Sequence, residues 1–330
     1  MLSFVITAIL LVPFIDFLYK LKLQRKHQKT KDMFNKRTPI FDKFNSWKVG
    51  TPIGGGILIV AVTTLLTLWA YGLFAVDVKF WEIFVLLFSF IGFGAIGFYD
   101  DIKKILNKNN QGFFGLRFKH KFVLQWILAL IIGSVFYFQL GYSFIFFPFI
   151  GQIPMGIFFI FFSAFVIVSF VNAFNITDGL DGLAPGLFII ALIAFLTISH
   201  ALLDSFLALF ISILVGSVVA FLYFNIFPAR IWLGDVGSLA LGAALAVIGL
   251  LTGKIGAVGV IGGVFVIEVA SSLIQILGKK FYKKKILPVA PIHLYFLQKG
   301  WGEPKTVMRI WLFGIIFAII GLYIAFARTS

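Results

Sequence analysis

The chain has 330 residues, of which 61% are hydrophobic, 18% aromatic and only 12% charged, with a mean hydropathy of +1.05. Soluble domains carry about 25% charged residues, so this composition excludes a soluble globular protein and predicts a polytopic membrane protein. The absence of cysteine excludes disulfides, thiolate catalysis and thiolate metal sites. The net charge of +15 favours contact with an anionic leaflet and anionic substrates over nucleic acid, because the basic residues are confined to loops between apolar runs.

Apolar runs of roughly 17 to 25 residues predict about ten transmembrane helices within one integral domain, residues 1–330. The first run is followed, not preceded, by basic residues, which is opposite to a cleavable signal peptide, so we expect it to be retained. The start of the fifth span is open, because 141–153 is also apolar. We therefore expect an all-α fold with spans near 2–20, 54–76, 80–99, 122–140, 154–173, 182–199, 203–224, 236–252, 256–277 and 308–327.

The loops between these spans alternate in charge. Loops 20–52, 100–121, 225–235 and 278–309 hold 10, 6, 1 and 8 of the 28 Lys and Arg residues. The positive-inside rule predicts that these four loops are cytoplasmic and that both termini are extracytoplasmic. The same alternation places 173–181 on the cytoplasmic side.

Acidic residues gather on this face, beginning with Asp100 and Asp101 at the end of the third expected span. Adjacent carboxylates at the C-terminal end of a helix repel each other and oppose the helix dipole, so folding alone does not favour them. A metal ion or a catalytic role would compensate. The structural alternative is simple ion pairing with Lys103 and Lys104.

The stretch from Asn172 to Gly186 joins the fifth and sixth expected spans, and it carries two asparagines and two carboxylates between long apolar runs. Asp178 and Asp181 are three residues apart, which puts them on one face if the sixth helix has already begun. The glycine after each leaves room for a large anionic ligand to approach the backbone. The alternative is a polar turn in which Thr177 or Asp178 caps the next helix.

Asp235 opens the eighth expected span and, considered alone, is best explained as an N-cap. Three polar clusters on one face together indicate a metal site, because their hard oxygen ligands suit Mg²⁺. Carboxylates, magnesium and lysines together suit a pyrophosphate, and no Walker or kinase motif accompanies them. These features favour exchange of one phosphoanhydride for another at the membrane surface, with nearby basic residues that include Lys48, Lys104, Lys119 and Lys121.

The sequence alone leaves the roles of two further residues open. Glu268 lies within a span, where an ionisable side chain is either functional or a structural hydrogen-bonding partner. His293 stands in the last cytoplasmic loop beside a proline, where a lone histidine is usually an ordinary surface residue.

These motifs, in this order, resemble those of the phospho-N-acetylmuramoyl-pentapeptide-transferases, which belong to the polyprenyl-phosphate N-acetylhexosamine-1-phosphate transferase superfamily (glycosyltransferase family 4). The resemblance covers nearly the whole chain, and each motif alone is weak. It is carried by Lys48–Gly55, Gly97–Lys104, Asn172–Gly186, Asn225 with Pro228, Gly234–Gly242, Gly263–Glu268, Pro291–His293 and Lys299–Lys305.

The resemblance implies ten transmembrane helices in a bacterial inner membrane, with a cytoplasmic active site. It implies that Asp235 binds Mg²⁺ and that Asp100 and Asp101 serve the polyprenyl phosphate and the transfer step, with Asp100 acting either as a base or through a covalent intermediate. Trp232 falls where the family has an aromatic residue that packs on uracil. The other substrate-binding residues that it implies are Lys48, Lys104, Lys121, Asn172, Asn175, Asp178, Asp181, Asn225 and His293.

The implied reaction transfers phospho-N-acetylmuramoyl-pentapeptide from its UDP form to undecaprenyl phosphate, with release of UMP, as the first lipid intermediate of peptidoglycan synthesis forms. The partners that the resemblance implies are therefore the UDP-sugar and the carrier lipid, and a homodimer would match the dimers common among family members. Two departures bear on the donor sugar. The family's run of three histidines is here His293-Leu294-Tyr295, and Ile53 replaces a common threonine.

Two alternatives follow. A UDP-N-acetylglucosamine-1-phosphate transferase for other surface glycans would fit the shortened histidine run, although Lys299–Lys305 favours the muramoyl enzyme. A non-catalytic transporter or flippase would place its polar residues near mid-membrane, whereas these residues are expected at the cytoplasmic ends of the spans.

Overall fold

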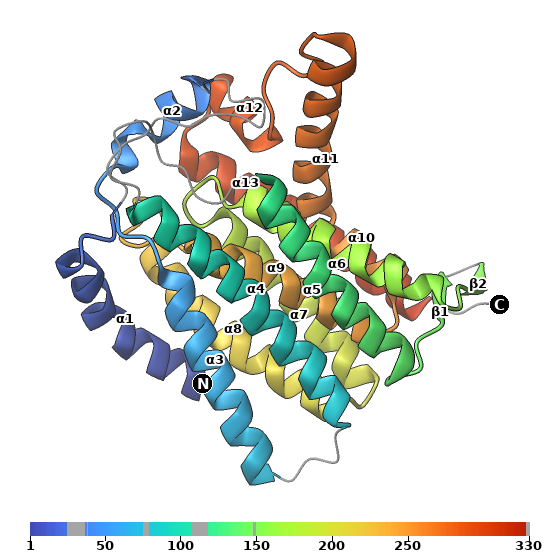
Figure 1. Cartoon of the computed structure of the whole chain (residues 1–330). Coiled ribbons are helices and arrows are strands. Elements are labelled where there is room, and N and C mark those ends of the chain that lie inside the picture. The colour runs from blue at the N-terminus through green and yellow to red at the C-terminus, as the bar shows by residue number, and fades with distance from the viewer. Residues whose placement is uncertain (25–36, 38, 75–78, 107–117, 148–149, 328–330) are drawn as a thin grey trace.

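The computed structural model describes residues 1–24, 37, 39–74, 79–106, 118–147 and 150–327. Within this part of the chain, nine helices are long and apolar enough to cross a membrane, and a bent helix pair makes up to ten. The polytopic helical architecture is thereby confirmed (Figure 1). Parts of two of the basic loops, residues 25–36 and 107–117, and also Arg328, lie outside the described residues.

The long helices follow the expected spans closely. They are α1 Leu2–Lys20, α3 Gly55–Phe74, α4 Phe80–Leu106, α5 Phe118–Phe138, α6 Phe158–Thr177, α7 Leu183–Ala201, α8 Ser205–Asn225, α9 Gly234–Leu251 and α13 Glu303–Phe326. Shorter elements are α2 Pro39–Asn45, a 3-10 turn at Ser46–Lys48, α10 Ile255–Ile261, α11 Gly263–Leu277, a π-helical turn at Gly278–Tyr282 and α12 Ile292–Gln298.

Helix α9 is the centre of the bundle. Every residue from Val236 to Leu250 is buried, and α3, α4 and α6 pack along it. Small residues allow this close packing. A Cβ added to Gly56 of α3 would lie 2.2 Å from the backbone nitrogen of Gly237, and one added to Gly97 of α4 would lie 2.2 Å from the carbonyl oxygen of Asp235. Neither backbone contact would survive a larger side chain.

The all-α class describes most of the chain, but one short apolar stretch is not helical. Residues 141–153 do not lengthen the fifth span but form an antiparallel hairpin of β1 Phe144–Phe147 and β2 Gly151–Pro154, with Phe144 opposite Pro154. A short apolar run is compatible with a strand as well as a helix. Glycines with positive φ at 141, 151 and 156 supply the turns that a helix would not tolerate.

The ninth expected span, 256–277, is broken. Helices α10 and α11 meet at an angle of 74°, so α11 leaves the bundle and projects beyond it (Figure 1). The break falls at Gly262 and Gly263, a pair of the kind at which helices kink. A Cβ on Gly262 would lie 2.4 Å from the ring of Phe170 on α6, so the glycine also lets the bend pack against α6.

Candidate active site

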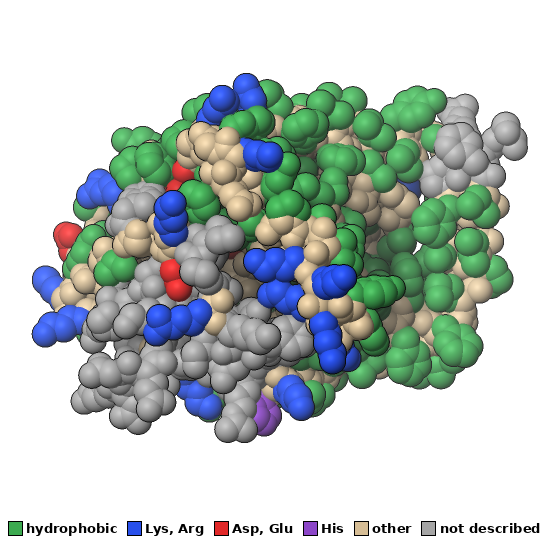
Figure 2. Space-filling model, turned by 90° about the horizontal axis from the view of Figure 1, so that it is seen from above, with side chains coloured by type: hydrophobic (Ala, Val, Ile, Leu, Met, Phe, Trp, Pro, Cys, Tyr) green, Lys and Arg blue, Asp and Glu red, His purple; other side chains and the backbone are tan. Residues whose placement is uncertain are grey.

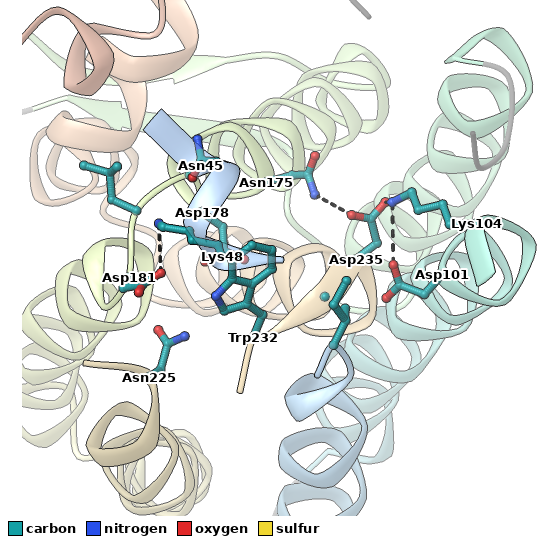
Figure 3. A pocket seen from close by; sticks show the side chains of 14 residues that line it. Asn45, Lys48, Asp101, Lys104, Asn175, Asp178, Asp181, Asn225, Trp232 and Asp235 are labelled. Atoms are coloured by element: carbon teal, nitrogen blue, oxygen red, sulfur yellow. Dashed lines mark hydrogen bonds and ion pairs between the residues drawn. The ribbon is translucent and has the colours of Figure 1, made fainter. Parts of the chain in front are cut away.

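A polar pocket opens at the end of the bundle where α4 and α6 finish and α9 begins. Its volume is ≈ 190 Å³. Nine of the expected substrate, metal or catalytic residues line it: Lys48, Asp101, Lys104, Asn175, Asp178, Asp181, Asn225, Trp232 and Asp235. They come from segments that are far apart in the chain and converge on one space (Figure 3). Asn45, which the sequence did not single out, lines it as well.

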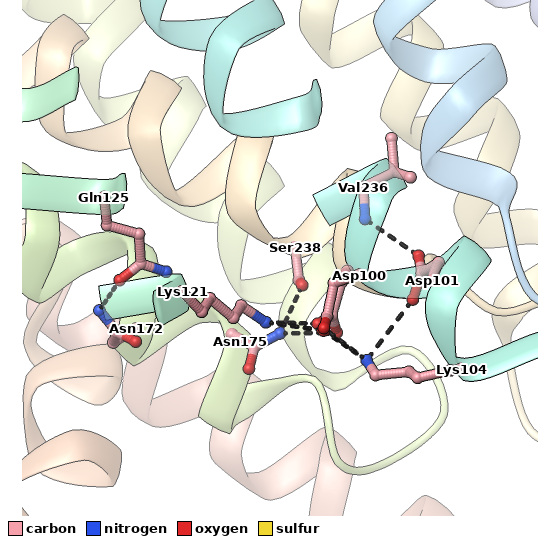
Figure 4. Close-up of polar contacts among 10 residues, drawn as sticks. Asp100, Asp101, Lys104, Lys121, Gln125, Asn172, Asn175, Val236 and Ser238 are labelled. Carbon is pink, nitrogen blue, oxygen red and sulfur yellow. Dashed lines mark hydrogen bonds and ion pairs between the residues drawn. The ribbon is translucent and has the colours of Figure 1, made fainter. Parts of the chain in front are cut away.

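On one side of the pocket lies a cluster of three carboxylates and two lysines, here called the carboxylate–lysine cluster: Asp100, Asp101, Asp235, Lys104 and Lys121. Asp101, Lys104 and Asp235 line the pocket, and Asp100 and Lys121 contact them from beside it. Lys104 Nζ lies 2.9 Å from Asp100 Oδ2, 2.8 Å from Asp235 Oδ2 and 3.6 Å from Asp101 Oδ1. Lys121 Nζ lies 3.2 Å from Asp100 Oδ2 and also pairs with Asp235 Oδ2 (Figure 4). The ammonium groups thus share carboxylate oxygens from two helices.

Local structure explains how the cluster forms. Helix α4 continues to Leu106 instead of ending near residue 99, so Asp100 and Lys104 lie one turn apart and pair across it. The contact at Gly97 brings this turn against the start of α9, where the backbone N–H of Val236 donates to Asp101 Oδ2 at 3.2 Å. Gly234, with a φ of +76°, leaves the space in which the Asp101 carboxylate lies.

The N-cap interpretation of Asp235 was wrong. Leu233 occupies the N-cap position of α9, and Asp235 lies in the first turn. Its side chain instead accepts from Lys104, Lys121 and, at 3.2 Å, from Asn175 Nδ2. The expected pairing of Asp100 and Asp101 with a nearby lysine is present, with Lys104 as the partner.

The two asparagines of α6 have different surroundings. Asn175 Nδ2 donates to Ser238 Oγ at 2.7 Å as well as to Asp235, so it reaches the pocket. Asn172, one turn earlier, donates to Gln125 Oε1 of α5 and to the carbonyl of Val168, both at 2.8 Å. Figure 4 shows Asn172 and Gln125 to the side of the cluster. Asn172 therefore links α6 to α5 beside Lys121.

The opposite side of the pocket is built on a buried lysine. Lys48 is 2% exposed, and its Nζ lies 2.9 Å from Asp181 Oδ1 and 2.6 Å from Glu303 Oε1. Glu303 also accepts from the backbone N–H of Asp181 at 2.7 Å, and Asp181 Oδ2 accepts from the N–H of Ala229 at 2.9 Å. This group, called the Lys48 triad, joins the N-terminal segment, the 178–182 loop and the start of α13.

Neighbouring residues hold the same loops in place. Asn225 at the end of α8 accepts from the N–H of Gly182 at 3.0 Å and donates to the carbonyl of Ile231 at 2.9 Å. Trp232 bonds through its backbone to Pro52, Gly54 and Gly55. Its ring lies 5.7 Å from Lys48 Nζ, so an aromatic face and a buried cation stand together (Figure 3).

Asp178 and Asp181 do not share a helical face, because the next helix has not yet begun at these residues. Helix α7 begins only at Leu183 with Gly182 as its N-cap, so neither Thr177 nor Asp178 caps it. Both aspartates lie in the loop and line the pocket. Burial raises the pKa of the Asp178 carboxyl to about 7, and the neighbouring carboxylates of Asp235 and Asp181 add to the effect, while Lys48 opposes it.

His293 lies behind the pocket loop. It is fully buried, and its Nδ1 lies 3.0 Å from Glu268 Oε2 on α11. A Cβ on Gly179 would lie 2.6 Å from His293 Nε2, so the imidazole packs directly against the glycine between Asp178 and Leu180. Among the described residues, His293 is not one that lines the pocket. Glu268, likewise fully buried, is its partner.

The charges around the pocket bear on the expected magnesium ion. Six carboxylates, of Asp100, Asp101, Asp178, Asp181, Asp235 and Glu303, face three lysines, Lys48, Lys104 and Lys121. In the described part of the chain no three acidic or histidine side chains are already arranged as metal ligands. The carboxylates around Lys104 nevertheless provide the hard oxygen donors that Mg²⁺ prefers, and an anionic ligand would need an added cation to offset their excess negative charge.

Sequence reasoning missed residues that act through partners. Glu303 was noted only as part of Lys299–Lys305, and its bond to Lys48 spans 255 positions. Gln125 and Ser238 carry no local signal, because a single polar residue in an apolar helix has many explanations. Asn45 precedes Lys48 by less than one helical turn, which is the one hint that it would share the pocket.

Comparison with known proteins agrees with this geometry. Residues 83–253 match the family described as Glycosyl transferase family 4, a segment that contains most of the pocket. The chain is 40% identical over 297 residues to the phospho-N-acetylmuramoyl-pentapeptide-transferase of Pelagibacter ubique. The aligned region covers 83% of this chain and 80% of that protein. The enzyme of the same name from a Geobacillus species is 37% identical over 328 residues, 98% of this chain and 95% of the relative.

A third relative of the same name, from Staphylococcus epidermidis, is 38% identical over 281 residues, with 84% of this chain and 86% of that protein covered. The likeness therefore extends over the whole bundle, beyond the motifs around the pocket. The chain belongs to glycosyl transferase family 4, alongside the phospho-N-acetylmuramoyl-pentapeptide-transferases.

Proposed function

We propose that this protein transfers phospho-N-acetylmuramoyl-pentapeptide from its UDP-linked form to undecaprenyl phosphate and releases UMP. The full-length similarity to enzymes of that name and a pocket with separate aromatic and phosphate-binding sides support it. The product would be a membrane-anchored diphosphate sugar. One phosphoanhydride replaces another, so the chemistry is nearly balanced in energy, and catalysis reduces to positioning and charge neutralisation.

The two sides of the pocket would bind different parts of the substrates. Trp232 and Lys48 suit the nucleotide, because an aromatic face stacks on a base and a buried ammonium attracts a phosphate oxygen. The carboxylate–lysine cluster suits the reacting phosphates, since Lys104 and Lys121 together can hold two anionic groups close enough to react. Asn175 and Asp178 lie between these sides, where the diphosphate of a bound donor would cross the pocket.

In the transfer step an oxygen of the carrier phosphate attacks the phosphorus that bears the sugar. A new P–O–P bond forms there, the bond from that phosphorus to UMP breaks, and UMP leaves with the bonding electron pair. Asp100, between Lys104 and Lys121, would orient the carrier phosphate and accept its proton where it carries one. Lys104 and Lys121 would hold the charge that builds on the bridging oxygens.

Asp235, with Asp101 beside it, is the proposed ligand set for Mg²⁺. When bound, the ion would neutralise phosphate oxygens and lower the repulsion between donor and acceptor. Lys104, whose ammonium lies 2.8 Å from Asp235 Oδ2, would have to share this carboxylate with the ion. Lysine and metal would then share the carboxylates in the complex.

The pocket is proposed to face the cytoplasm of a bacterial inner membrane, with both termini on the opposite side. The support is the concentration of Lys and Arg in the loops at the pocket end. A transporter would need its polar residues near mid-membrane. The pocket residues instead lie where α4 and α6 end and α9 and α13 begin, which favours an enzyme at the membrane surface.

The observation that carries the proposal is the meeting of the carboxylate–lysine cluster with Lys48 and Trp232 in one pocket. The test is UMP release by the purified protein with undecaprenyl phosphate and Mg²⁺, with UDP-N-acetylmuramoyl-pentapeptide or UDP-N-acetylglucosamine as donor. Turnover of the first alone is expected. Turnover of the second alone would indicate an N-acetylglucosamine-1-phosphate transferase and make the His293-Leu294-Tyr295 run a specificity change. Activity with neither would refute both.

A further inference from the structure

The end of α11 is a compact basic turn that the proposed reaction does not use. Helix α11 passes into a π-helical turn at Gly278–Tyr282, and Lys283, with a φ of +53°, reverses the chain. Gln275 holds the returning segment: its Nε2 donates to the carbonyl of Leu287 at 2.8 Å, and its Oε1 accepts from the backbone N–H groups of Ile286 and Leu287. The turn is therefore a built structure at the tip of a projecting helix (Figure 1).

This turn, here called the basic tip (residues 279–285), carries concentrated positive charge. Five of its seven residues are lysines, and the sequence holds no acidic residue between Glu268 and Glu303. The other two, Phe281 and Tyr282, are 68% and 72% exposed. On the face of the molecule that bears the pocket end, Lys and Arg side chains greatly outnumber acidic ones (Figure 2).

The helix below the tip shows where the tip lies relative to a bilayer. Leu273, Ile274 and Leu277 of α11 are exposed large apolar side chains, whereas Glu268, Ser271 and Gln275 on its other face are buried. An exposed apolar face suits acyl chains, so the lysines just beyond it lie at the depth of lipid phosphates. Phe281 and Tyr282 lie among the lysines, and exposed aromatic residues beside basic ones are typical of a membrane–water interface.

The same lysines are poorly placed for the nucleotide. The residues that line the polar pocket include Lys48 and Lys104 but, among the described residues, none from the tip. The apolar face, the aromatic pair and the dense charge instead match a surface that is at once apolar and anionic. We propose that the basic tip binds the anionic headgroups of phospholipids in the adjacent leaflet and so anchors α11 to the membrane surface.

Anchoring α11 would matter to the pocket, because Glu268 of α11 contacts His293, which packs against Gly179 of the pocket loop. The lipid contact itself does not depend on the reaction and is tested without it. The chain contains no cysteine, so a single cysteine introduced as Tyr282→Cys can carry a fluorophore on an unmodified background. Ile286→Cys, at a residue that is 52% exposed, gives a second label position if the first variant folds poorly.

The labelled protein is placed in phosphatidylcholine nanodiscs that contain a small share of headgroup spin-labelled phosphatidylglycerol or, separately, spin-labelled phosphatidylcholine. We expect the anionic lipid to quench the label at least about threefold more than the neutral lipid, because each lysine near an anionic surface adds attraction. The preference should vanish near 1 M salt, where the Debye length is about 3 Å.

The test variant replaces Lys280, Lys283, Lys284 and Lys285 with glutamine, which keeps much of the side-chain length and the polarity but removes the charge. It should lose the lipid preference, whereas Lys20→Gln with Lys22→Gln at the end of α1 should retain it. Equal quenching by both lipids, or a preference that survives the four glutamines, would overturn the proposal. So would a raised KM of the four-glutamine variant for undecaprenyl phosphate in neutral lipid, because the lysines would then hold the carrier phosphate.

Discussion

Lys48 offers the sharpest test of how the pocket is held together. Its ammonium is 2% exposed and stands between two carboxylates, of Asp181 at 2.9 Å and Glu303 at 2.6 Å. Replacing it with methionine keeps much of the side-chain volume but leaves two negative charges buried side by side. Breaking a buried ion pair by removing one partner costs about 3–5 kcal/mol, so Lys48→Met should lower the free energy of unfolding by that amount.

A second substitution should recover much of the loss. In Lys48→Met with Glu303→Gln, one carboxylate becomes a neutral amide that can still accept from the N–H of Asp181. Asp181 keeps the N–H of Ala229 as a donor, so the buried repulsion disappears. We expect the double variant to lie within about 2 kcal/mol of the wild type, although donor turnover should stay low because the ammonium beside Trp232 is gone.

Denaturant titration in detergent micelles, followed by circular dichroism, measures the stabilities, and UMP release measures activity. Glu303→Gln alone completes the double-mutant cycle, and Lys48→Arg tests whether a planar guanidinium can replace a compact ammonium. If Lys48→Met unfolds within about 1 kcal/mol of the wild type, or if the double variant is no more stable than the single one, the buried triad does not hold the pocket as described.

Three further predictions follow from the site. Asp235→Asn should reduce UMP release by at least about 100-fold with the circular dichroism spectrum unchanged, and near-normal turnover would remove Asp235 from the metal site. Gly97→Ala should destabilise the protein and impair turnover, because its Cβ would lie 2.2 Å from Asp235 O, whereas Gly72→Ala, with nothing within 4 Å, should be neutral or stabilising. Because the pKa of Asp178 is raised in the folded protein, its carboxyl lowers the free energy of unfolding as pH rises from about 4 to 7. The difference in the free energy of unfolding between Asp178→Asn and the wild type should therefore shift by about 1–3 kcal/mol in favour of the variant from pH 5 to pH 8 in denaturant titrations. The same difference at pH 5 and at pH 8 would contradict this.

Much of the bundle could be predicted because a bilayer imposes its thickness on the sequence. Apolar runs such as 203–224 differ from the observed helix, Ser205–Asn225, by only one or two residues. Prediction was weaker where the chain leaves the apolar layer. Helix α4 extends through Asp100 and Lys104 because these side chains pair along it. Hydropathy alone does not predict this extension, because it takes no account of ion pairs.

The hairpin at 144–154 and the break at Gly262 escaped for another reason. Both lie in apolar sequence whose conformation depends on glycines with a particular backbone or packing role. Hydrophobic periodicity cannot distinguish a short strand from part of a helix, and a Gly-Gly pair within a span is also compatible with simple close packing. Tertiary contacts, such as that of Gly262 with Phe170, decide between these outcomes.

The residue types of the site were predictable, but their partners were not. Asp100, Asp101, Asp178, Asp181 and Asp235 stood out as carboxylates at the ends of apolar spans, and all of them lie at or beside one pocket. Glu303 did not, because its role depends on Lys48, which lies in a different part of the chain. His293 was expected in the pocket and lies behind Gly179 instead.

In this pocket the same residues form structural ion pairs and are candidates for catalytic roles. Lys104 is the ion-pair partner that the structural alternative required for Asp100 and Asp101, and it also lines the pocket. In the free protein the lysines offset carboxylates that would otherwise repel one another. If the proposed function holds, a bound diphosphate would pair with these lysines, and the carboxylates they release would need a cation in their place. Donor and Mg²⁺ should therefore favour each other's binding, because each supplies the charge that the other displaces. The ion pairs that stabilise the pocket would thus also prepare it for both.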